Sequence, residues 1–115
     1  MTINEYQTKA HTFALYPYGH IDEGSEVDYF YPALGLAEEA GEVAGKYAKA
    51  VRDCKGSIDD ERKEAIIKEL GDVCWFVAEL STLLDVPLQE VMTRNINKLT
   101  SRLNRGVING EGDNR

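Results

Sequence analysis

The chain has 115 residues, which suits one domain with a core of its own but is short enough that assembly into oligomers would help to bury apolar surface. Its 13 basic and 20 acidic residues give a net charge of −7, which argues against a nucleic-acid polymer as the main ligand. The N-terminus lacks the features of a signal peptide and no apolar run approaches the roughly 18 residues of a membrane span, so we expect a cytoplasmic protein without a membrane partner.

A first amphipathic helix is predicted over residues 3 to 15, where apolar residues recur at helical spacing, and Pro17 should end it. His11 lies on this helix, and we expect it to be a surface or hydrogen-bonded structural residue. The following segment, 16–30, is long for a simple connection and contains Pro17, Gly19 and Gly24. We expect it to be mobile or to fold over a site.

A second helix is predicted from about Ala33 to Asp53, with Pro32 in its first turn. An apolar stripe runs along it beside acidic positions. Glu39 and Glu42 are three residues apart and therefore share a helix face, with Glu38 directly before them.

A third helix is predicted from about Asp59 to Leu84, with acidic residues in its first turn, where the helix dipole favours them. Glu69 and Asp72 share one face of it. After Val73 the apolar residues cover more than one face, so this helix should be the most buried or be shared with another subunit. Glu79 lies seven residues after Asp72, and we expect it to support that site from behind or to form an ion pair, without being a ligand.

A fourth helix is predicted from about Leu88 to Arg105. Beside its apolar stripe runs a polar one made of Asn95, Lys98, Arg102 and Arg105. Basic side chains near the C-terminal end of a helix are favourable on a solvated face, which is one interpretation of this stripe. The other interpretation is that the stripe recognises phosphate. The glycine-rich tail, about 106–115, cannot continue the helix and is expected to be flexible unless something binds it.

Two carboxylate pairs on helix faces are electrostatically unfavourable alone, because like charges raise each other's pKa. If the second and third helices face each other, four carboxylates converge, and a divalent cation that prefers oxygen ligands would compensate them. Solvated surface acids are the alternative. Glycines inside both helices, each costing roughly 1 kcal/mol relative to alanine, favour the first interpretation, because a solvated face does not require them. They are Gly35, Gly41, Gly45 and Gly71.

No histidine follows a glutamate at a spacing of three, as a ferritin-type di-iron site would require. Mg²⁺ is therefore the preferred metal, with Mn²⁺ as a substitute.

The pattern Glu38-Glu39-x-x-Glu42 followed by Glu69-x-x-Asp72 resembles the signature of the MazG-like, all-α nucleoside triphosphate pyrophosphohydrolases. The resemblance extends to the residues 31–37 before it, to Asn95-x-x-Lys98 and Arg102 after it, and to an ending, 105–115, that is similar to the tail of short single-domain members. It implies an all-α fold, an antiparallel bundle of four main helices forming a single domain over residues 1–115.

The resemblance also implies hydrolysis of a nucleoside or deoxynucleoside triphosphate to the monophosphate and pyrophosphate, a reaction suited to cleansing the nucleotide pool. Mg²⁺ would be held by Glu39, Glu42, Glu69 and Asp72. Glu38 departs from short relatives in which that position is not acidic. It could orient a water or serve as general base, but the preferred expectation is that it supports the site from behind the metal ligands. The substrate would be bound by Asn95, Lys98, Arg102 and Arg105.

Three questions stay open at this stage. The aromatic residues 29–31 are expected to pack against the first helix, in preference to stacking on a nucleobase. Apolar surface near Trp75 predicts a homodimer or homotetramer. The competing function is a non-catalytic helical interaction or regulatory module whose acids form ion pairs between subunits.

Overall fold

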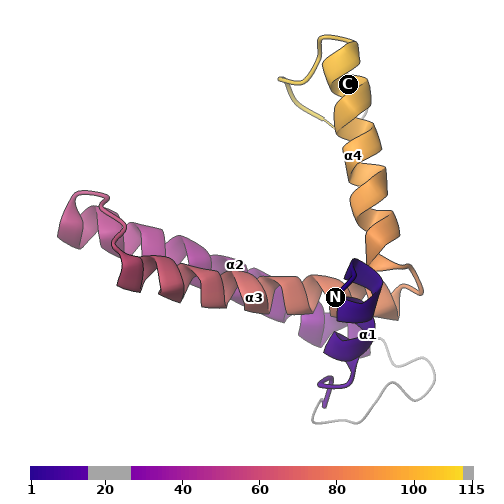
Figure 1. The fold of residues 1–115 in the computed structure, drawn as a ribbon, viewed down its shortest axis with the longest axis horizontal. Helices are drawn as coiled ribbons and strands as arrows, with labels where there is room; N and C mark the ends of the chain where they lie inside the picture. The colour runs from indigo at the N-terminus through magenta and orange to yellow at the C-terminus, as the bar shows by residue number, and fades with distance from the viewer. Residues whose placement is uncertain (16–26, 113–115) are drawn as a thin grey trace.

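The computed structural model describes residues 1–15 and 27–112, with side chains from residue 30 onward in the second of these ranges. These ranges contain four helices and no strand: α1 (Ile3–His11), α2 (Val27–Cys54), α3 (Asp60–Leu83) and α4 (Leu88–Asn104). The expected all-α class with four main helices is confirmed. The helices α2 and α3 run antiparallel as a long hairpin, α1 crosses one end of it, and α4 projects away from that end (Figure 1).

The first helix is capped at its N-terminus by side chains. Thr2 and Glu5 form a capping box, in which the Glu5 N–H donates to Thr2 Oγ1 at 3.1 Å and Thr2 N–H donates to Glu5 Oε2 at 2.6 Å. The helix ends at His11, earlier than the predicted residue 15. Beyond His11 the chain is no longer helical: Ala14 is buried, whereas Phe13 and Leu15 are largely exposed.

The second helix starts at Val27, six residues earlier than predicted. Pro32 therefore lies inside the helix instead of at its start, and its side chain is fully buried. Proline has no N–H to donate to the carbonyl four residues before it, which is tolerated close to a helix N-terminus better than in a helix interior. The segment 16–26, expected to be mobile or to cover a site, lies outside the described residues.

The hairpin turn and the start of α3 follow the sequence closely. Lys55 and Gly56 have positive φ angles of 54° and 83°, which reverse the chain after α2. Asp59 then caps α3 by accepting a hydrogen bond from the Arg62 N–H at 2.9 Å. Because these signals are local, the predicted bounds of α3 agree with the observed bounds to within a residue.

The core lies where α1 crosses α3, around Ala10, Ala78 and Leu88. Trp75 packs there, and its indole N–H donates to the carbonyl of Ala10 at 3.0 Å. Gln7 ties α1 to the α3–α4 turn, because its side-chain oxygen accepts from the Leu88 N–H at 2.7 Å and its amide nitrogen donates to the carbonyl of Val86 at 3.1 Å. The base of α4 is thereby fixed against α1 and α3.

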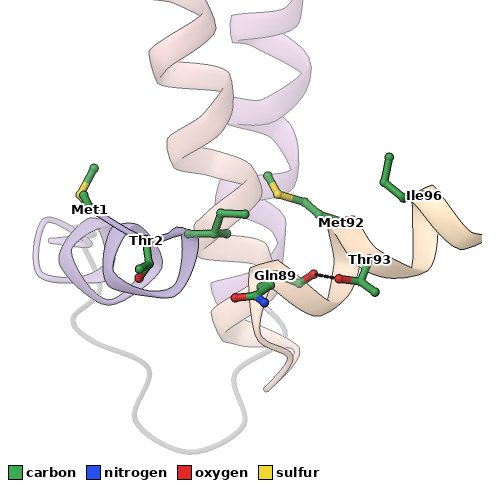
Figure 2. Close-up of a pocket in the computed structure, with 7 residues that line it drawn as sticks. Met1, Thr2, Gln89, Met92, Thr93 and Ile96 are labelled. Atoms are coloured by element: carbon green, nitrogen blue, oxygen red, sulfur yellow. Dashed lines mark hydrogen bonds between the residues drawn. The ribbon is translucent and has the colours of Figure 1, made fainter.

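Beyond that base, α4 leaves the rest of the chain (Figure 1). Among the described residues it contacts α1 and α3 but not α2. In the angle between α1 and α4 is an open pocket of about 560 Å³, in which Met92 and Ile96 follow the inner side of α4 (Figure 2). It is lined by Met1, Thr2, Ile3, Gln89, Met92, Thr93 and Ile96.

None of the described helices is both long and apolar enough to span a membrane.

Candidate metal centre

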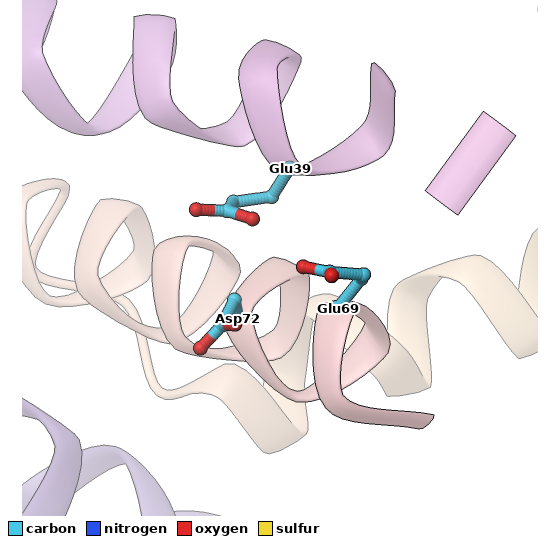
Figure 3. Close-up of side chains that lie close together, drawn as sticks. All are labelled: Glu39, Glu69 and Asp72. Atoms are coloured by element: carbon cyan, nitrogen blue, oxygen red, sulfur yellow. The ribbon is translucent and has the colours of Figure 1, made fainter. Parts of the chain in front are cut away.

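The pairing of α2 with α3 gathers three of the predicted carboxylates. Glu39 comes from α2, and Glu69 and Asp72 come from successive turns of α3 (Figure 3). One carboxylate oxygen of each lies within 4.8 Å of the others. Glu39 and Glu69 are half-buried and Asp72 is exposed, so the cluster opens to solvent on one side. An oxygen-ligand set of this spacing fits a hard divalent cation.

The fourth predicted ligand, Glu42, is not part of this three-carboxylate cluster. Its side chain is 52% exposed and lies 4.0 Å from Nζ of Lys46, one turn further along α2. The same Lys46 Nζ lies 2.8 Å from Oε1 of Glu69, whose side chain is only 18% exposed. Lys46 therefore bridges the two acidic segments. It was missed in the sequence, although its positions four after Glu42 and seven after Glu39 place it on their face.

The close approach of the carboxylates shifts the pKa values of two residues at the cluster. Partial burial raises the pKa of Glu39, and the neighbouring charges of Asp72, Glu38, Glu69 and Glu42 raise it further. The hydrogen bond to Glu69 raises the pKa of Lys46, helped by the charges of Glu69 and Glu42. The fold thus holds carboxylates together against their mutual repulsion. Lys46 supplies a positive charge that partly compensates them.

The other predicted site residues are not members of the three-carboxylate cluster. Glu38 is exposed on α2. The four residues predicted to bind substrate are on or just after α4, which does not contact α2. Arg102 is buried at the end of α4 and its Nη2 donates to the carbonyl of Gly112 at 3.3 Å, while Arg105 Nε donates to Ser101 Oγ at 3.3 Å. Their roles stay predictions.

Glu79 belongs to a separate pair. Its side chain is fully buried, and Nδ1 of His11 lies 3.1 Å and 3.2 Å from its two carboxylate oxygens. The expectation that His11 is a hydrogen-bonded structural residue is confirmed, and Glu79 is its partner. The pair joins α1 to α3 at the core.

Two sequence-based interpretations need correction. Of the four helix glycines, only Gly35 is required by close packing, since a Cβ atom there would lie 2.2 Å from Cζ of Phe76. Gly41, Gly45 and Gly71 face open space, so the approach of α2 to α3 does not explain them.

The aromatic residues before the acidic motif were expected to pack on the first helix, but α1 and α2 make no contact in the described parts of the chain, which include the side chains of Phe30 and Tyr31. The ring of Tyr31 instead lies 6.1 Å from that of Phe76 on α3, between centroids, and Phe30 is largely exposed. Among the described residues, α2 is therefore positioned by its contacts with α3.

Comparison with known proteins decides the family. The model of the MazG nucleotide pyrophosphohydrolase domain matches residues 32–107, which include the whole carboxylate cluster. The chain belongs to this family. The MazG match begins at Pro32 and ends just after α4, so it covers the hairpin and the projecting helix but not α1.

Two curated proteins are similar to this MazG chain. Gene 37 protein of Mycobacterium phage L5 is 48% identical over 115 residues, covering the whole of both chains. The uncharacterized protein YvdC of Bacillus subtilis strain 168 is 40% identical over 76 residues, which are 58% of this chain and 68% of that protein. No solved structure matches the chain.

Proposed function

We propose that this MazG-family protein hydrolyses a nucleoside or deoxynucleoside triphosphate to the monophosphate and pyrophosphate in a reaction that depends on Mg²⁺. The observation that supports the proposal is the cluster of Glu39, Glu69 and Asp72, whose oxygens lie within 4.8 Å of one another inside the matched domain.

The donor set favours a hard cation. All three groups are carboxylates, and neither a histidine nor a cysteine belongs to the cluster among the described residues. Oxygen ligands of this kind select Mg²⁺ or Mn²⁺ over the softer transition metals. When bound, Mg²⁺ supplies positive charge at phosphate oxygens and makes a bound water more acidic.

The residues of the chain have different roles in the proposed reaction. Glu39, Glu69 and Asp72 would hold the metal, and Glu42 is one turn away on the solvent side of α2. Glu38 precedes Glu39 and would accept a proton from the attacking water or orient it. Lys46, held by Glu69, keeps a positive charge beside the acids. Lys98 and Arg102 would neutralise the charge that develops on the departing pyrophosphate.

The decisive experiment is analysis of the products by ion-exchange chromatography. The protein is incubated with a panel of NTPs and dNTPs, with Mg²⁺ and with EDTA, beside Asp72→Asn and Glu42→Ala. Glu64→Gln is the matched control, because Glu64 is an exposed acid on α3 outside the cluster. We expect monophosphate and pyrophosphate to form only with Mg²⁺. Asp72→Asn should lose turnover, whereas the control Glu64→Gln should keep the turnover of the wild type.

Turnover that survives in EDTA or in Asp72→Asn would refute the metal-dependent reaction. A Mg²⁺-induced rise in melting temperature without turnover of any nucleotide in the panel would refute the proposed substrates and leave a metal-binding protein. Absence of both would favour the helical interaction module.

A further inference from the structure

Negative charge accumulates around the candidate metal centre. The cluster consists of three carboxylates, and the charges of Glu38 and Glu42 are also close enough to raise the pKa of Glu39. A divalent cation would balance only part of this charge. Because a nucleoside triphosphate is itself strongly anionic, a substrate that approaches these acids needs positive side chains in addition to the metal.

Lys46 is the basic side chain that the described ion pairs place in this acidic region. It lies on α2, seven residues after Glu39 and four after Glu42, and therefore on the helix face of both acids. Its Nζ lies 2.8 Å from Oε1 of Glu69 and 4.0 Å from Oε2 of Glu42. The ammonium group thus contacts one carboxylate of the cluster and lies near an exposed carboxylate outside it.

The ammonium group of Lys46 has the capacity to bind a further oxygen. It has three N–H donors, and the hydrogen bond to Glu69 uses one of them. The distance of 4.0 Å to Glu42 is longer than a hydrogen bond. The side chain of Lys46 is 26% exposed, so it is accessible from solvent. An incoming phosphate oxygen can therefore accept a hydrogen bond from Lys46 while Glu69 keeps its own.

Contact with Lys46 does not remove Glu69 from the set of candidate metal ligands. The 2.8 Å contact is to Oε1, and a carboxylate has a second oxygen with lone pairs of its own. A carboxylate that binds a metal is usually also hydrogen-bonded to a neighbouring group, because that contact orients it. A phosphate attracted to a cation at Glu69 would therefore lie beside the residue that Lys46 already contacts.

We propose that Lys46 is a substrate-binding residue, whose ammonium group donates a hydrogen bond to a phosphate oxygen of the triphosphate held at the cluster. This inference rests on the proposed function and adds to it a phosphate-binding cation. That cation comes from the same chain and the same helix face as Glu39, whereas the basic residues of α4 lie on a helix that does not contact α2 among the described residues.

The alternative role of Lys46 is to relieve the repulsion between the carboxylates and nothing more. In that case Lys46 is dispensable once a divalent cation balances the same acids. In the proposed role, Lys46 is needed when metal and phosphate are both present. The two roles therefore predict different results at saturating Mg²⁺.

Isothermal titration calorimetry with inorganic tripolyphosphate separates the two roles, because this probe has the phosphate chain without a base or a sugar. Mg²⁺ is kept in excess over both protein and probe. Lys46→Met should bind the probe about tenfold more weakly than the wild type, because a hydrogen bond between charged groups is lost. Lys46→Arg keeps the charge and the donors and should retain most of the affinity. Lys49→Met, which removes an exposed lysine of the same helix, should bind the probe as the wild type does.

A titration of the melting temperature with Mg²⁺ alone checks that the carboxylate cluster stays intact. Lys46→Met should need no more Mg²⁺ than the wild type for half of the maximal thermal shift, because a positive neighbour of the ligands has been removed. Weaker binding of the probe with undiminished binding of the metal would exclude a distorted cluster as the cause.

Three results would overturn the proposal. The first is a wild type that binds no tripolyphosphate at saturating Mg²⁺, and the second is a Lys46→Met protein that binds it with wild-type affinity. The third is a parallel loss of Mg²⁺ binding and probe binding in Lys46→Met, which would show that Lys46 only maintains the cluster.

Failure of this inference is distinguishable from failure of the proposed function. In an active wild type, Lys46→Met should raise the KM for the nucleotide at saturating Mg²⁺ and change kcat less, because the lost contact is already made to the bound substrate. An active protein whose Lys46→Met variant keeps the wild-type KM refutes the role of Lys46 and leaves the reaction intact. A wild type that hydrolyses no nucleotide refutes the proposed function, while the binding of tripolyphosphate still decides whether Lys46 contacts phosphate.

Discussion

The ammonium nitrogen of Lys46 lies 2.8 Å from Oε1 of Glu69, a carboxylate that belongs to the candidate metal centre. The ammonium group of Lys46 therefore occupies one side of a carboxylate that a divalent ion would need as a ligand. A metal that takes up Glu69 must compete with Lys46 or share the carboxylate with it. This relationship makes the response to Mg²⁺ depend on a residue that is not itself a ligand.

Replacement of Lys46 by methionine should strengthen Mg²⁺ binding. The carboxylates lose their internal counter-charge, so the metal-free protein should melt at a lower temperature, and a few-fold less Mg²⁺ should give half of the maximal thermal shift. The measurement is a Mg²⁺ titration followed by differential scanning fluorimetry, with Lys49→Met as control, since Lys49 is exposed on the same helix. An unchanged midpoint would show that Lys46 does not compete with the metal.

The crowding of Glu39 predicts a pH dependence in the absence of metal. Burial and neighbouring carboxylates raise its pKa in the folded protein. The contribution of protonated Glu39 to folding stability is therefore fully present below its unfolded-state pKa. This contribution is lost as the pH rises through the raised pKa of the folded state. Glu39→Gln, which mimics the protonated form, should melt above the wild type at neutral pH in EDTA, and the difference should vanish toward pH of about 4.

The check is the melting temperature of both proteins from acid to neutral pH, with Glu64→Gln as a control outside the cluster. Saturating Mg²⁺ should reverse the order at neutral pH, because only the wild type keeps the full ligand set. A difference that does not change with pH would argue against crowding as its cause.

The sequence predicted best the features that are set by neighbouring residues. The bounds of α3 and α4 follow from the Asp59 cap and from Pro87, and the position of Glu69 and Asp72 on one face of α3 follows from their spacing of three residues. The predicted start of α2 is wrong, because Pro32 does not mark the helix boundary and is tolerated inside the early turns.

What the sequence did not predict depends on how helices are placed in space. Periodicity gives the face of a helix but neither its partner nor its register, so the bridge from Lys46 to Glu69 was missed, as was the role of Gln7 in fixing the α3–α4 turn. For the same reason, periodicity gives the basic stripe of α4 but not its distance from the acids, and among the described residues α4 does not contact α2.

Removal of His11 should destabilise the fold without affecting the metal centre. His11→Ala leaves the fully buried Glu79 carboxylate without its hydrogen-bond partner, and removal of one partner of a buried charged pair typically costs about 3–5 kcal/mol. A loss of this size corresponds to a fall in melting temperature of more than about 10 °C for a domain of this size. Thermal unfolding measures it, and the Mg²⁺-induced shift should persist in the variant. Glu79→Gln, which removes the buried charge, should restore part of the stability when combined with His11→Ala.

Two glycine-to-alanine substitutions should change the free energy of unfolding in opposite directions. Gly35→Ala places a Cβ atom 2.2 Å from the Phe76 ring, so the ring or the helices must shift, and such overpacking typically costs about 1–3 kcal/mol. Gly45→Ala meets nothing within 4 Å and gains helix propensity of roughly 1 kcal/mol. Chemical denaturation of both variants measures the free energies of unfolding. The smaller side chain in Phe76→Leu should offset part of the Gly35→Ala loss, because the ring is what the new methyl group meets. Equal effects at the two positions would show that α2 and α3 are not packed around Gly35 as described, and that propensity alone decides the outcome.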